Sequence, residues 1–167
     1  MSGYKGPKNS AQYRRKKARF ILTCILTLVL IASAVATRMG VRVVRVSGDS
    51  MFPTYKNGEL VVMLPANYID DNYPVCWIKV GEHNLIKRLI GYPGDTVELI
   101  DGDTYVNGEL IMKRVGQNWD NIKFVLGEDQ YVFLGDNRGD SQDSRAWVSP
   151  YVQRSQIMGI AINSGLK

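Results

Sequence analysis

The sequence predicts a mainly β domain that follows one membrane-spanning helix. Two observations carry this prediction. Residues 20–37 form an uncharged run of 18 residues, and the chain after it consists of short apolar, β-branched runs separated by Gly, Pro, Asn and Asp. With 167 residues, 45% hydrophobic and 22% charged, the chain suits one folded domain with a short appendage.

The uncharged run lies between Arg19 and Arg38. At a rise of about 1.5 Å per residue it would be about 27 Å long as a helix, close to the thickness of the bilayer's hydrocarbon core. Its apolar residues occupy every face, which favours a membrane helix over a buried core helix. We therefore expect a basic leader at 1–19, a transmembrane signal-anchor helix at 20–38 and one further domain at 39–167.

The end of this segment also fits a second interpretation. Ala32-Ser33-Ala34 and Ala34-Val35-Ala36 show the small-x-small pattern of a cleavable secretory signal. No Pro or Gly precedes these alanines in the segment, and the basic leader is long for a signal peptide, so the sequence favours a retained anchor.

Charge is unevenly distributed along the chain. Residues 1–48 contain ten Lys and Arg and no acidic residue, whereas the remainder contains 11 basic and 16 acidic residues. An acidic domain argues against nucleic-acid binding. Basic residues beside a membrane helix stay on the cytoplasmic side, so we expect a cytoplasmic N-terminus and an extracytoplasmic domain. The basic residues nearest the helix are Arg14, Arg15, Lys16, Lys17 and Arg19.

The domain is expected to contain several short antiparallel strands. Asp101-Gly102 and Asn107-Gly108 are strong signals for two tight hairpins between residues 97 and 111. A helix is expected at residues 146–155. The expected strands are 41–46, 60–64, 75–80, 84–90, 96–100, 104–106, 131–134 and 156–162.

The first expected strand joins the helix to the domain and alternates valine with Arg42 and Arg45. Its arginine stems could lie on apolar surface while their guanidinium groups meet lipid phosphates. An ordinary edge strand with outward charges explains the pattern equally well.

Several kinds of site are excluded or weakly supported. A single histidine, His83, rules out a zinc site built from a cluster of imidazoles, and it lies in an expected solvent loop. No glycine-rich nucleotide-binding loop is present, and no cofactor is implied. Cys24 lies in the anchor and Cys76 in the domain, so the two cannot pair within one chain, and Cys76 is expected to be a buried strand residue.

Two segments suggest chemistry. Ser50 lies in a turn, residues 47–54, in which Gly48 allows close backbone approach and Pro53 stiffens the exit. Lys87 lies in an apolar run, 85–90, where alternation places it on one face with Leu85 and Leu89. Burial would lower the lysine pKa and favour a neutral amine that can act as a base.

A third segment, Gly135-Asp136-Asn137-Arg138-Gly139-Asp140-Ser141-Gln142-Asp143-Ser144-Arg145, is polar and follows an apolar run. Together with SMFPT around Ser50 and KRLIGYPGD around Lys87, it resembles the bacterial type I signal peptidases over nearly the whole chain and in the same order. The absence of a long β insertion makes the chain similar to the compact, single-anchor form of Gram-positive bacteria.

The resemblance implies a membrane-bound serine endopeptidase that removes signal peptides from secreted preproteins. It implies Ser50 as nucleophile, Lys87 as general base and Ser141 as the residue that orients the lysine amine. Met51 and Pro53 would shape the turn. Three further residues would form one supporting ion-pair network, namely Asp136, Asp143 and Arg145.

The oxyanion hole departs from the pattern of some family members. Its implied donors are the Ser50 backbone N–H and a hydroxyl two residues earlier, but that position is Gly48, which has no side-chain donor. The second donor stays open.

The implied substrates are signal peptides with small residues at the first and third positions before the cut, bound as an added strand. Val43, Val44 and Leu85 could shape the substrate pocket, and Phe52 either touches lipid or packs inside the domain. Lipids and the export machinery are the other expected partners, and no nucleic acid is expected.

Two alternative functions remain: a specialised peptidase that matures pilus or conjugation proteins, and a non-catalytic relative that assists assembly of exported subunits. A self-cleaving repressor would carry a DNA-binding domain in place of the anchor.

Overall fold

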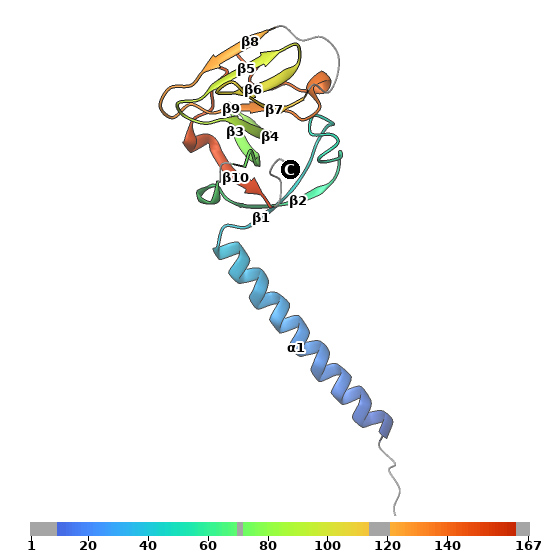
Figure 1. The fold of residues 1–167 in the computed structure, drawn as a ribbon. Helices are drawn as coiled ribbons and strands as arrows, with labels where there is room; N and C mark the ends of the chain where they lie inside the picture. The colour runs from blue at the N-terminus through green and yellow to red at the C-terminus, as the bar shows by residue number, and fades with distance from the viewer. Residues whose placement is uncertain (1–9, 70–71, 114–120, 163–167) are drawn as a thin grey trace, which may run out of the picture. The chain divides into compact units, whose positions relative to one another are not determined.

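A computed structural model describes residues 10–69, 72–113 and 121–162. The chain divides into two compact units, Met1–Gly40 and Val41–Lys167. Each unit is described by itself. The first contains the helix α1, and the second contains all the strands (Figure 1).

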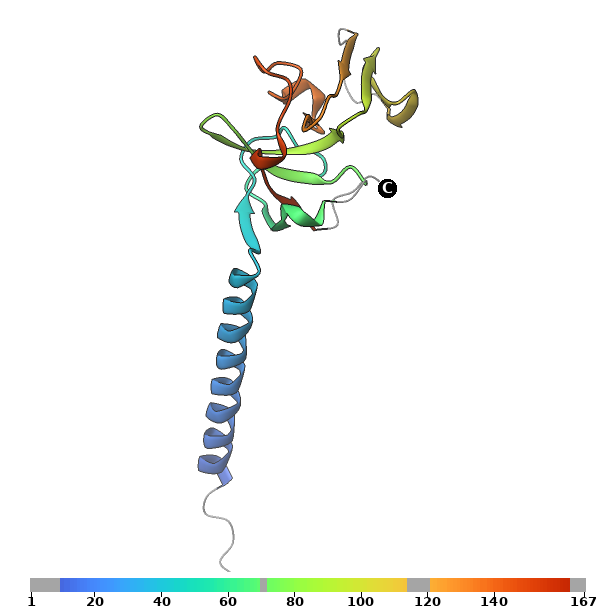
Figure 2. The same cartoon turned by 90° about the vertical axis from the view of Figure 1, so that its left-hand side faces the viewer.

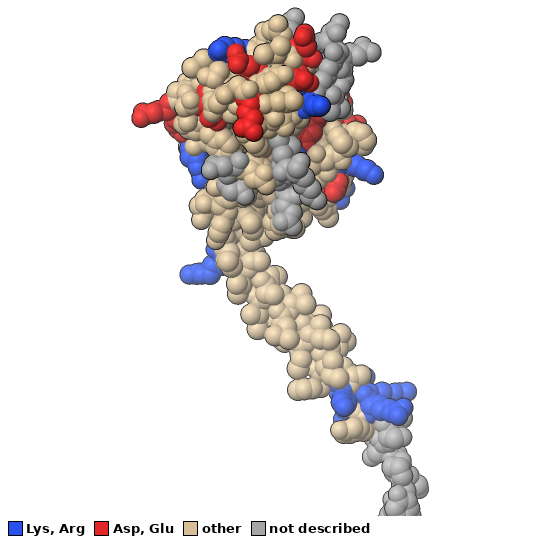
Figure 3. Space-filling model, viewed as in Figure 1, with Lys and Arg blue, Asp and Glu red and all other residues tan. Residues whose placement is uncertain are grey.

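The helix α1 spans Ser10–Arg38, so it begins well before the uncharged run that predicts it. Lys and Arg are good helix formers, which explains why the basic residues ahead of the run continue the helix. The stretch Gln12–Arg38 is long and apolar enough to cross a membrane, and none of it is buried in the protein. Figure 3 shows the basic side chains gathered at its amino-terminal end, followed by a long uncharged surface.

Three threonine hydroxyls within the helix are bound to its own backbone. The hydroxyls of Thr23, Thr27 and Thr37 each donate a hydrogen bond of 2.8–2.9 Å to a backbone carbonyl three or four residues earlier. Such bonds remove the need for water as a partner, which a helix in lipid requires.

The second unit contains two antiparallel sheets, as the sequence predicts. The larger has six strands in the order β1-β2-β10-β3-β4-β9. Figure 2, turned by 90°, shows β3 and β4 as a long hairpin in this sheet. Its strands are β1 (Arg42–Arg45), β2 (Leu60–Pro65), β3 (Val75–Val80), β4 (His83–Gly91), β9 (Val132–Leu134) and β10 (Ile157–Ala161).

The smaller sheet has four strands in the order β7-β6-β5-β8. Both predicted hairpins are present, because Asp101, Gly102, Asn107 and Gly108 all have positive φ, between 51° and 91°. Its strands are β5 (Thr96–Ile100), β6 (Asp103–Val106), β7 (Glu109–Met112) and β8 (Ile122–Val125).

The core consists of three apolar clusters. One lies beneath the turn that carries Ser50 and is centred on Met51 and Met63. A second, around Phe133, covers the middle of the six-stranded sheet and includes Cys76, which is fully buried in β3 as predicted. The third joins the two sheets, because it combines Ile90 at the end of β4 with residues such as Phe124 of the smaller sheet.

The structure differs from the sequence prediction in three places. Residues 146–155 are not an α-helix. Residue 146 ends a turn and residues 147–149 form bends, Val152 forms a bridge with Tyr131, and a single 3-10 turn begins at Arg154. Strand β8 is not predicted, because only two of its four side chains turn inward. His83 begins β4 instead of lying in a loop, although it is exposed.

Candidate active site

The turn that carries Ser50 is fixed at both ends. Val46 exchanges backbone hydrogen bonds with the segment Gly58–Glu59, which closes the loop between β1 and β2. Gly48 has φ of +84° and donates its N–H to Asn57 Oδ1 at 3.1 Å. Met51, whose side chain is 0% exposed, anchors the turn in the core and leaves Ser50 half-buried at the surface.

Lys87 extends from β4 to this turn. Its Nζ lies 2.6 Å from Ser50 Oγ, and its side chain is only 4% exposed. Burial is the main cause that lowers the Lys87 pKa from its ordinary value, and the Asp143 carboxylate opposes it. The geometry therefore joins a hydroxyl to a lysine whose neutral form is favoured, an arrangement that can activate an oxygen nucleophile.

Asp143 and Arg145 form a buried, two-pronged ion pair. The Arg145 Nε and Nη2 atoms lie 2.7 and 2.8 Å from the two Asp143 oxygens, and the Gly135 N–H donates to Oδ2 at 2.9 Å. Burial alone would raise the Asp143 pKa, but the hydrogen bonds and charge of Arg145 bring it below its ordinary value. This pair ties the polar loop back onto itself after β9.

Asp136 belongs to a different pair from the one that the resemblance implies. It does not join Asp143 and Arg145. Its carboxylate accepts two hydrogen bonds of 2.7 Å from Arg88 and one of 2.5 Å from Thr54. Sequence analysis assigned no role to Arg88 or Thr54. The site therefore has two separate ion pairs, and that of Asp136 links β4, the polar loop and the exit of the Ser50 turn.

Ser141 lies in the same loop, next to Gly135. Its Oγ is buried and makes no hydrogen bond of good geometry among the described residues, but it lies close enough to the Asp143 carboxylate to help lower the pKa of that group. A side chain at Gly135 would collide with the Ser141 hydroxyl and would lie 2.7 Å from the Ser50 carbonyl oxygen. Glycine at 135 thus allows the polar loop to pack directly on the nucleophile's turn.

Asn137 fastens the same loop to that turn through two hydrogen bonds. Its backbone N–H donates to the Ser50 carbonyl at 2.9 Å, and its Nδ2 donates to the Asp49 carbonyl at 3.1 Å. Sequence analysis noted this residue only as part of the polar motif. Nothing in the local sequence indicates the contact, because the partners lie 88 residues apart.

The other candidate groups, His83 and Cys76, are not part of the Ser50–Lys87 contact. His83 is exposed at the start of β4, four residues and about 13 Å along the strand from Lys87. Cys76 is opposite Lys87 in the neighbouring strand, but it is fully buried. Among residues 10–69, 72–113 and 121–162, no group of three or more His, Cys, Asp or Glu could hold a metal ion.

A small cavity of about 90 Å³ opens beside Ser50 and Lys87. Two chain segments form most of its wall, one from Arg45 to Ser47 and the other from Asn84 to Ile86. Leu85 lines the cavity, as the sequence suggests, but Val43 and Val44 do not. Val46, Met51 and Ile86 supply its other apolar surface.

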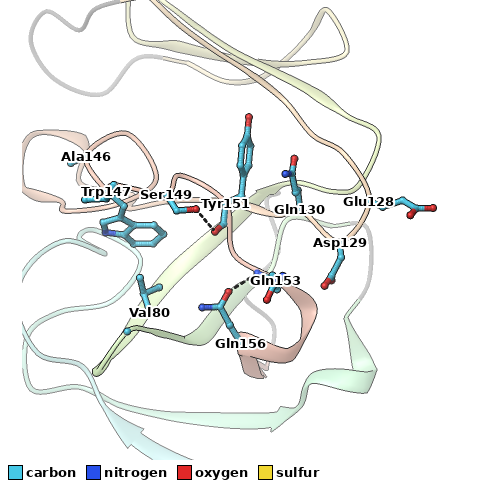
Figure 4. A pocket seen from close by; sticks show the side chains of 12 residues that line it. Val80, Glu128, Asp129, Gln130, Ala146, Trp147, Ser149, Tyr151, Gln153 and Gln156 are labelled. Atoms are coloured by element: carbon cyan, nitrogen blue, oxygen red, sulfur yellow. Dashed lines mark hydrogen bonds between the residues drawn. The ribbon is translucent and has the colours of Figure 1, made fainter.

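A larger cavity, of about 740 Å³, lies away from the Ser50–Lys87 pair at the tip of the β3–β4 hairpin (Figure 4). Trp147 and Val80 face each other on one side of it, and Gln153 and Gln156 lie on another. Its described polar groups are engaged locally: Gln156 Oε1 accepts from the Gln153 N–H, and Ser149 Oγ donates to the Tyr151 carbonyl. No acid–base pair lines it.

Comparison with known proteins identifies the family of the chain. A family model described as signal peptidase, peptidase S26, matches residues 17–164. The chain is similar to signal peptidase I S of Bacillus subtilis (strain 168), with 34% identity covering 68% of this chain and 71% of that protein. It is also similar to the probable signal peptidase I-2 of a Synechocystis strain, with 33% identity covering 64% of this chain and about half (46%) of that protein.

One solved structure to which the chain is similar is a signal peptidase I from Enterococcus faecalis V583. The two share 25% identity with a TM-score of 0.48, over 55% of this chain and 96% of that one. The comparisons favour neither a pilus or conjugation peptidase nor a non-catalytic assembly factor. The chain belongs to the signal peptidase family, peptidase S26, and is a serine endopeptidase with one apolar helix suited to anchor it in a membrane.

Proposed function

We propose that this signal peptidase cleaves preproteins with Ser50 as nucleophile and Lys87 as general base. The observation that carries the proposal is the 2.6 Å contact between Lys87 Nζ and Ser50 Oγ, made by a lysine that is 4% exposed. A neutral amine at this distance can accept the hydroxyl proton directly.

The reaction would proceed by acyl transfer. Ser50 Oγ attacks the carbonyl carbon at the cleavage site while its proton passes to Lys87 Nζ. The resulting ammonium then protonates the leaving amine of the mature protein, and the signal peptide remains as an ester on Ser50. A water molecule, deprotonated by the same amine, hydrolyses this ester and restores both groups.

Ser141 is proposed to orient the Lys87 amine. Its hydroxyl is buried without a good hydrogen bond among the described residues, in a loop that packs on the Ser50 turn. A hydrogen bond between this hydroxyl and the Lys87 amine would hold the amine in the direction of Ser50, as the third group of such a site does. The Asp143–Arg145 and Asp136–Arg88 pairs would hold this loop and β4 in place.

The substrate is proposed to bind as an extended strand beside β4. Within the described residues, β9 pairs with β4 only from Arg88 onward, so the edge of Asn84–Ile86 is free next to the site. An extended peptide can hydrogen-bond to such an edge. At about 90 Å³ the adjoining cavity is much smaller than ordinary ligand pockets of about 300 Å³ or more. It would take only small side chains, which supports small residues at the first and third positions before the cut.

Membrane topology follows from the charge of the helix ends. We propose a cytoplasmic N-terminus and an extracytoplasmic catalytic domain, where preproteins emerge from the export machinery. Only residues 39–41 separate α1 from β1. On β1 and β2, Val43 lies opposite Val62, both exposed, and Arg42 and Arg45 are exposed nearby. Apolar side chains beside guanidinium groups suit contact with lipid headgroups.

The test is cleavage of a purified preprotein by the full chain in detergent. Ser50→Ala and Lys87→Ala should each lower kcat/KM by about a thousandfold or more, because each removes a reacting group. His83→Ala is the matched control and should retain full activity. Replacing the small residue before the cut by Trp should abolish cleavage. An active Lys87→Ala variant, or an inactive His83→Ala variant, would refute the assignment.

A further inference from the structure

Asn137 makes two hydrogen bonds to the main chain on either side of the nucleophile. Its own backbone N–H donates to the Ser50 carbonyl at 2.9 Å, and its side-chain Nδ2 donates to the Asp49 carbonyl at 3.1 Å. The residue lies between Asp136, which is held by Arg88, and Arg138, which is buried. Asn137 is therefore held on both sides and can act as a fixed support.

The Asp49 carbonyl and the Ser50 N–H belong to one peptide group. This group is planar and trans, so its C=O and N–H bonds point in opposite directions. A donor that fixes the Asp49 oxygen therefore also fixes the direction of the Ser50 N–H. A backbone donor also binds this oxygen, the Phe52 N–H at 3.0 Å, but it comes from within the turn itself.

The direction of this N–H matters because Ser50 N–H is the expected oxyanion donor. Gly48 offers no side-chain donor, and its own N–H is already bound to Asn57 Oδ1 at 3.1 Å. The site therefore depends strongly on one backbone donor, and a donor of this kind stabilises the transition state only when it is aimed in advance.

We propose that Asn137 is a positioning residue that aims the Ser50 N–H at the oxyanion. The inference rests on the proposed role of Ser50 as nucleophile. A purely structural Asn137 would stabilise the turn without favouring the transition state over the bound substrate. The two roles differ in what a substitution does to kcat, to KM and to the affinity for an oxyanion mimic.

The experiment compares Asn137→Ala and Asn137→Asp in the full chain in detergent. Asn137→Asp keeps the size and the backbone bond but places a carboxylate oxygen, which cannot donate, against the Asp49 carbonyl. Both variants should lower kcat by about ten- to a hundredfold, with KM changed less than about threefold. The matched control is Asn121→Ala, which removes one side-chain hydrogen bond, from the Asp101 N–H, in the smaller sheet. It should leave kcat unchanged.

A second readout uses two peptides of the same signal sequence, one ending in an aldehyde and the other in the corresponding alcohol. Ser50 Oγ adds to the aldehyde carbonyl, and the resulting oxygen occupies the oxyanion position. The aldehyde's affinity should fall in parallel with kcat, whereas the alcohol's affinity should not change. Equal losses for both peptides, or an unchanged kcat in variants that remain folded by thermal unfolding, would overturn the inference.

The outcome is distinguishable from failure of the proposed function. If Ser50→Ala retains activity, the nucleophile is wrong and the role of Asn137 falls with it. If Ser50→Ala is inactive while both Asn137 variants have wild-type kcat, only the positioning role is refuted. If Asn137→Ala does not fold, Asn137→Asp carries the test, because it retains the side-chain volume.

Discussion

The two sheets of the catalytic domain differ in where they place charge. The six-stranded sheet and the loop after β9 bury the charged side chains Lys87, Arg88, Asp136, Arg138 and Asp143. In the smaller sheet, the one buried polar side chain among the described residues is Thr104, whose hydroxyl accepts a hydrogen bond of 3.2 Å from Arg138, and the ion pair Glu98–Lys123 is partly exposed.

Burying a charge costs free energy unless the charge is paired. The difference in buried charge between the two sheets therefore shows where the fold accepts this cost. Charge is buried in the larger sheet beside the Ser50–Lys87 contact, where both ion pairs have short, two-pronged geometry. The smaller sheet instead supplies apolar residues such as Phe124 and Val97 that pack on the ends of β4 and β9. One sheet thus carries the chemistry, and the other holds it in place.

Among substitutions that leave Ser50 and Lys87 in place, the largest effect is expected from Gly135→Ala, at a close contact between the polar loop and the Ser50 turn. The added methyl group would collide with the Ser141 hydroxyl and lie 2.7 Å from the Ser50 carbonyl oxygen. Because a shift of about 1 Å can cost about a hundredfold, kcat/KM should fall at least that much. Gly108→Ala is the control: it also tests a glycine, but it has open space around it and only its positive φ is strained. Equal activity in the two variants would contradict this account.

Asp143→Asn tests the buried ion pair of the larger sheet. It leaves the Arg145 charge without its partner and should lower the free energy of unfolding by about 3–5 kcal/mol, with a parallel loss of activity. Glu98→Gln makes the same chemical change in the exposed pair of the smaller sheet, where the Lys123 side chain is 59% exposed, and should cost about 1 kcal/mol or less. Urea unfolding of both variants measures the contrast. Similar losses would show that burial does not distinguish the two sheets.

The pH dependence of activity and of stability tests Lys87 separately from the ion pairs around it. Since burial lowers the Lys87 pKa, kcat/KM should fall about tenfold for each pH unit below that pKa, because only the neutral amine accepts the Ser50 proton. The folded state also binds fewer protons than the unfolded state between the lowered pKa and 10.5. Wild-type stability should therefore rise with pH in this window relative to Lys87→Met. A flat difference between the two proteins would exclude a shifted lysine.

The smallest effect on activity is expected from Phe124→Ala, in the apolar cluster of the smaller sheet. The loss of a buried ring should lower the free energy of unfolding by about 3–5 kcal/mol. While the variant is folded, kcat/KM should stay within about twofold of the wild type, because Phe124 is not among the residues that contact the catalytic groups. A selective loss of kcat without a loss of stability would show that this sheet does more than support.

Much of this fold can be predicted from local sequence. The strands Val75–Val80 and Thr96–Ile100 begin and end where apolar alternation predicts, and both Asx-Gly hairpins are present. The helix expected at residues 146–155 is wrong, because contacts with distant residues, such as the bridge from Val152 to Tyr131, shape this segment.

Less of the site than of the fold can be predicted from the sequence. Motifs place Ser50 and Lys87 in one family pattern, but the partners of Arg88 and Asn137 lie 48 and 88 residues away. Strand alternation puts Arg88 on the face opposite Lys87, between Ile86 and Ile90, but the local sequence does not indicate which acidic residue it pairs with. The role of Arg88 follows only from the structure, in which its guanidinium binds the Asp136 carboxylate.

The alternation of side chains along β4 also determines what a shifted alignment of β4 on β3 would do to the site. Lys87 and Arg88 are adjacent and point to opposite faces, so a slip of one residue against β3 would exchange them. Ser50 would then meet a guanidinium, which offers only hydrogen-bond donors and cannot accept the serine proton. Such a misaligned protein would be inert and not merely slow. The irregular pairing between Leu89 and Gly91 against β9 helps to fix the register of β4. It therefore also helps to keep Lys87 as the residue that faces Ser50.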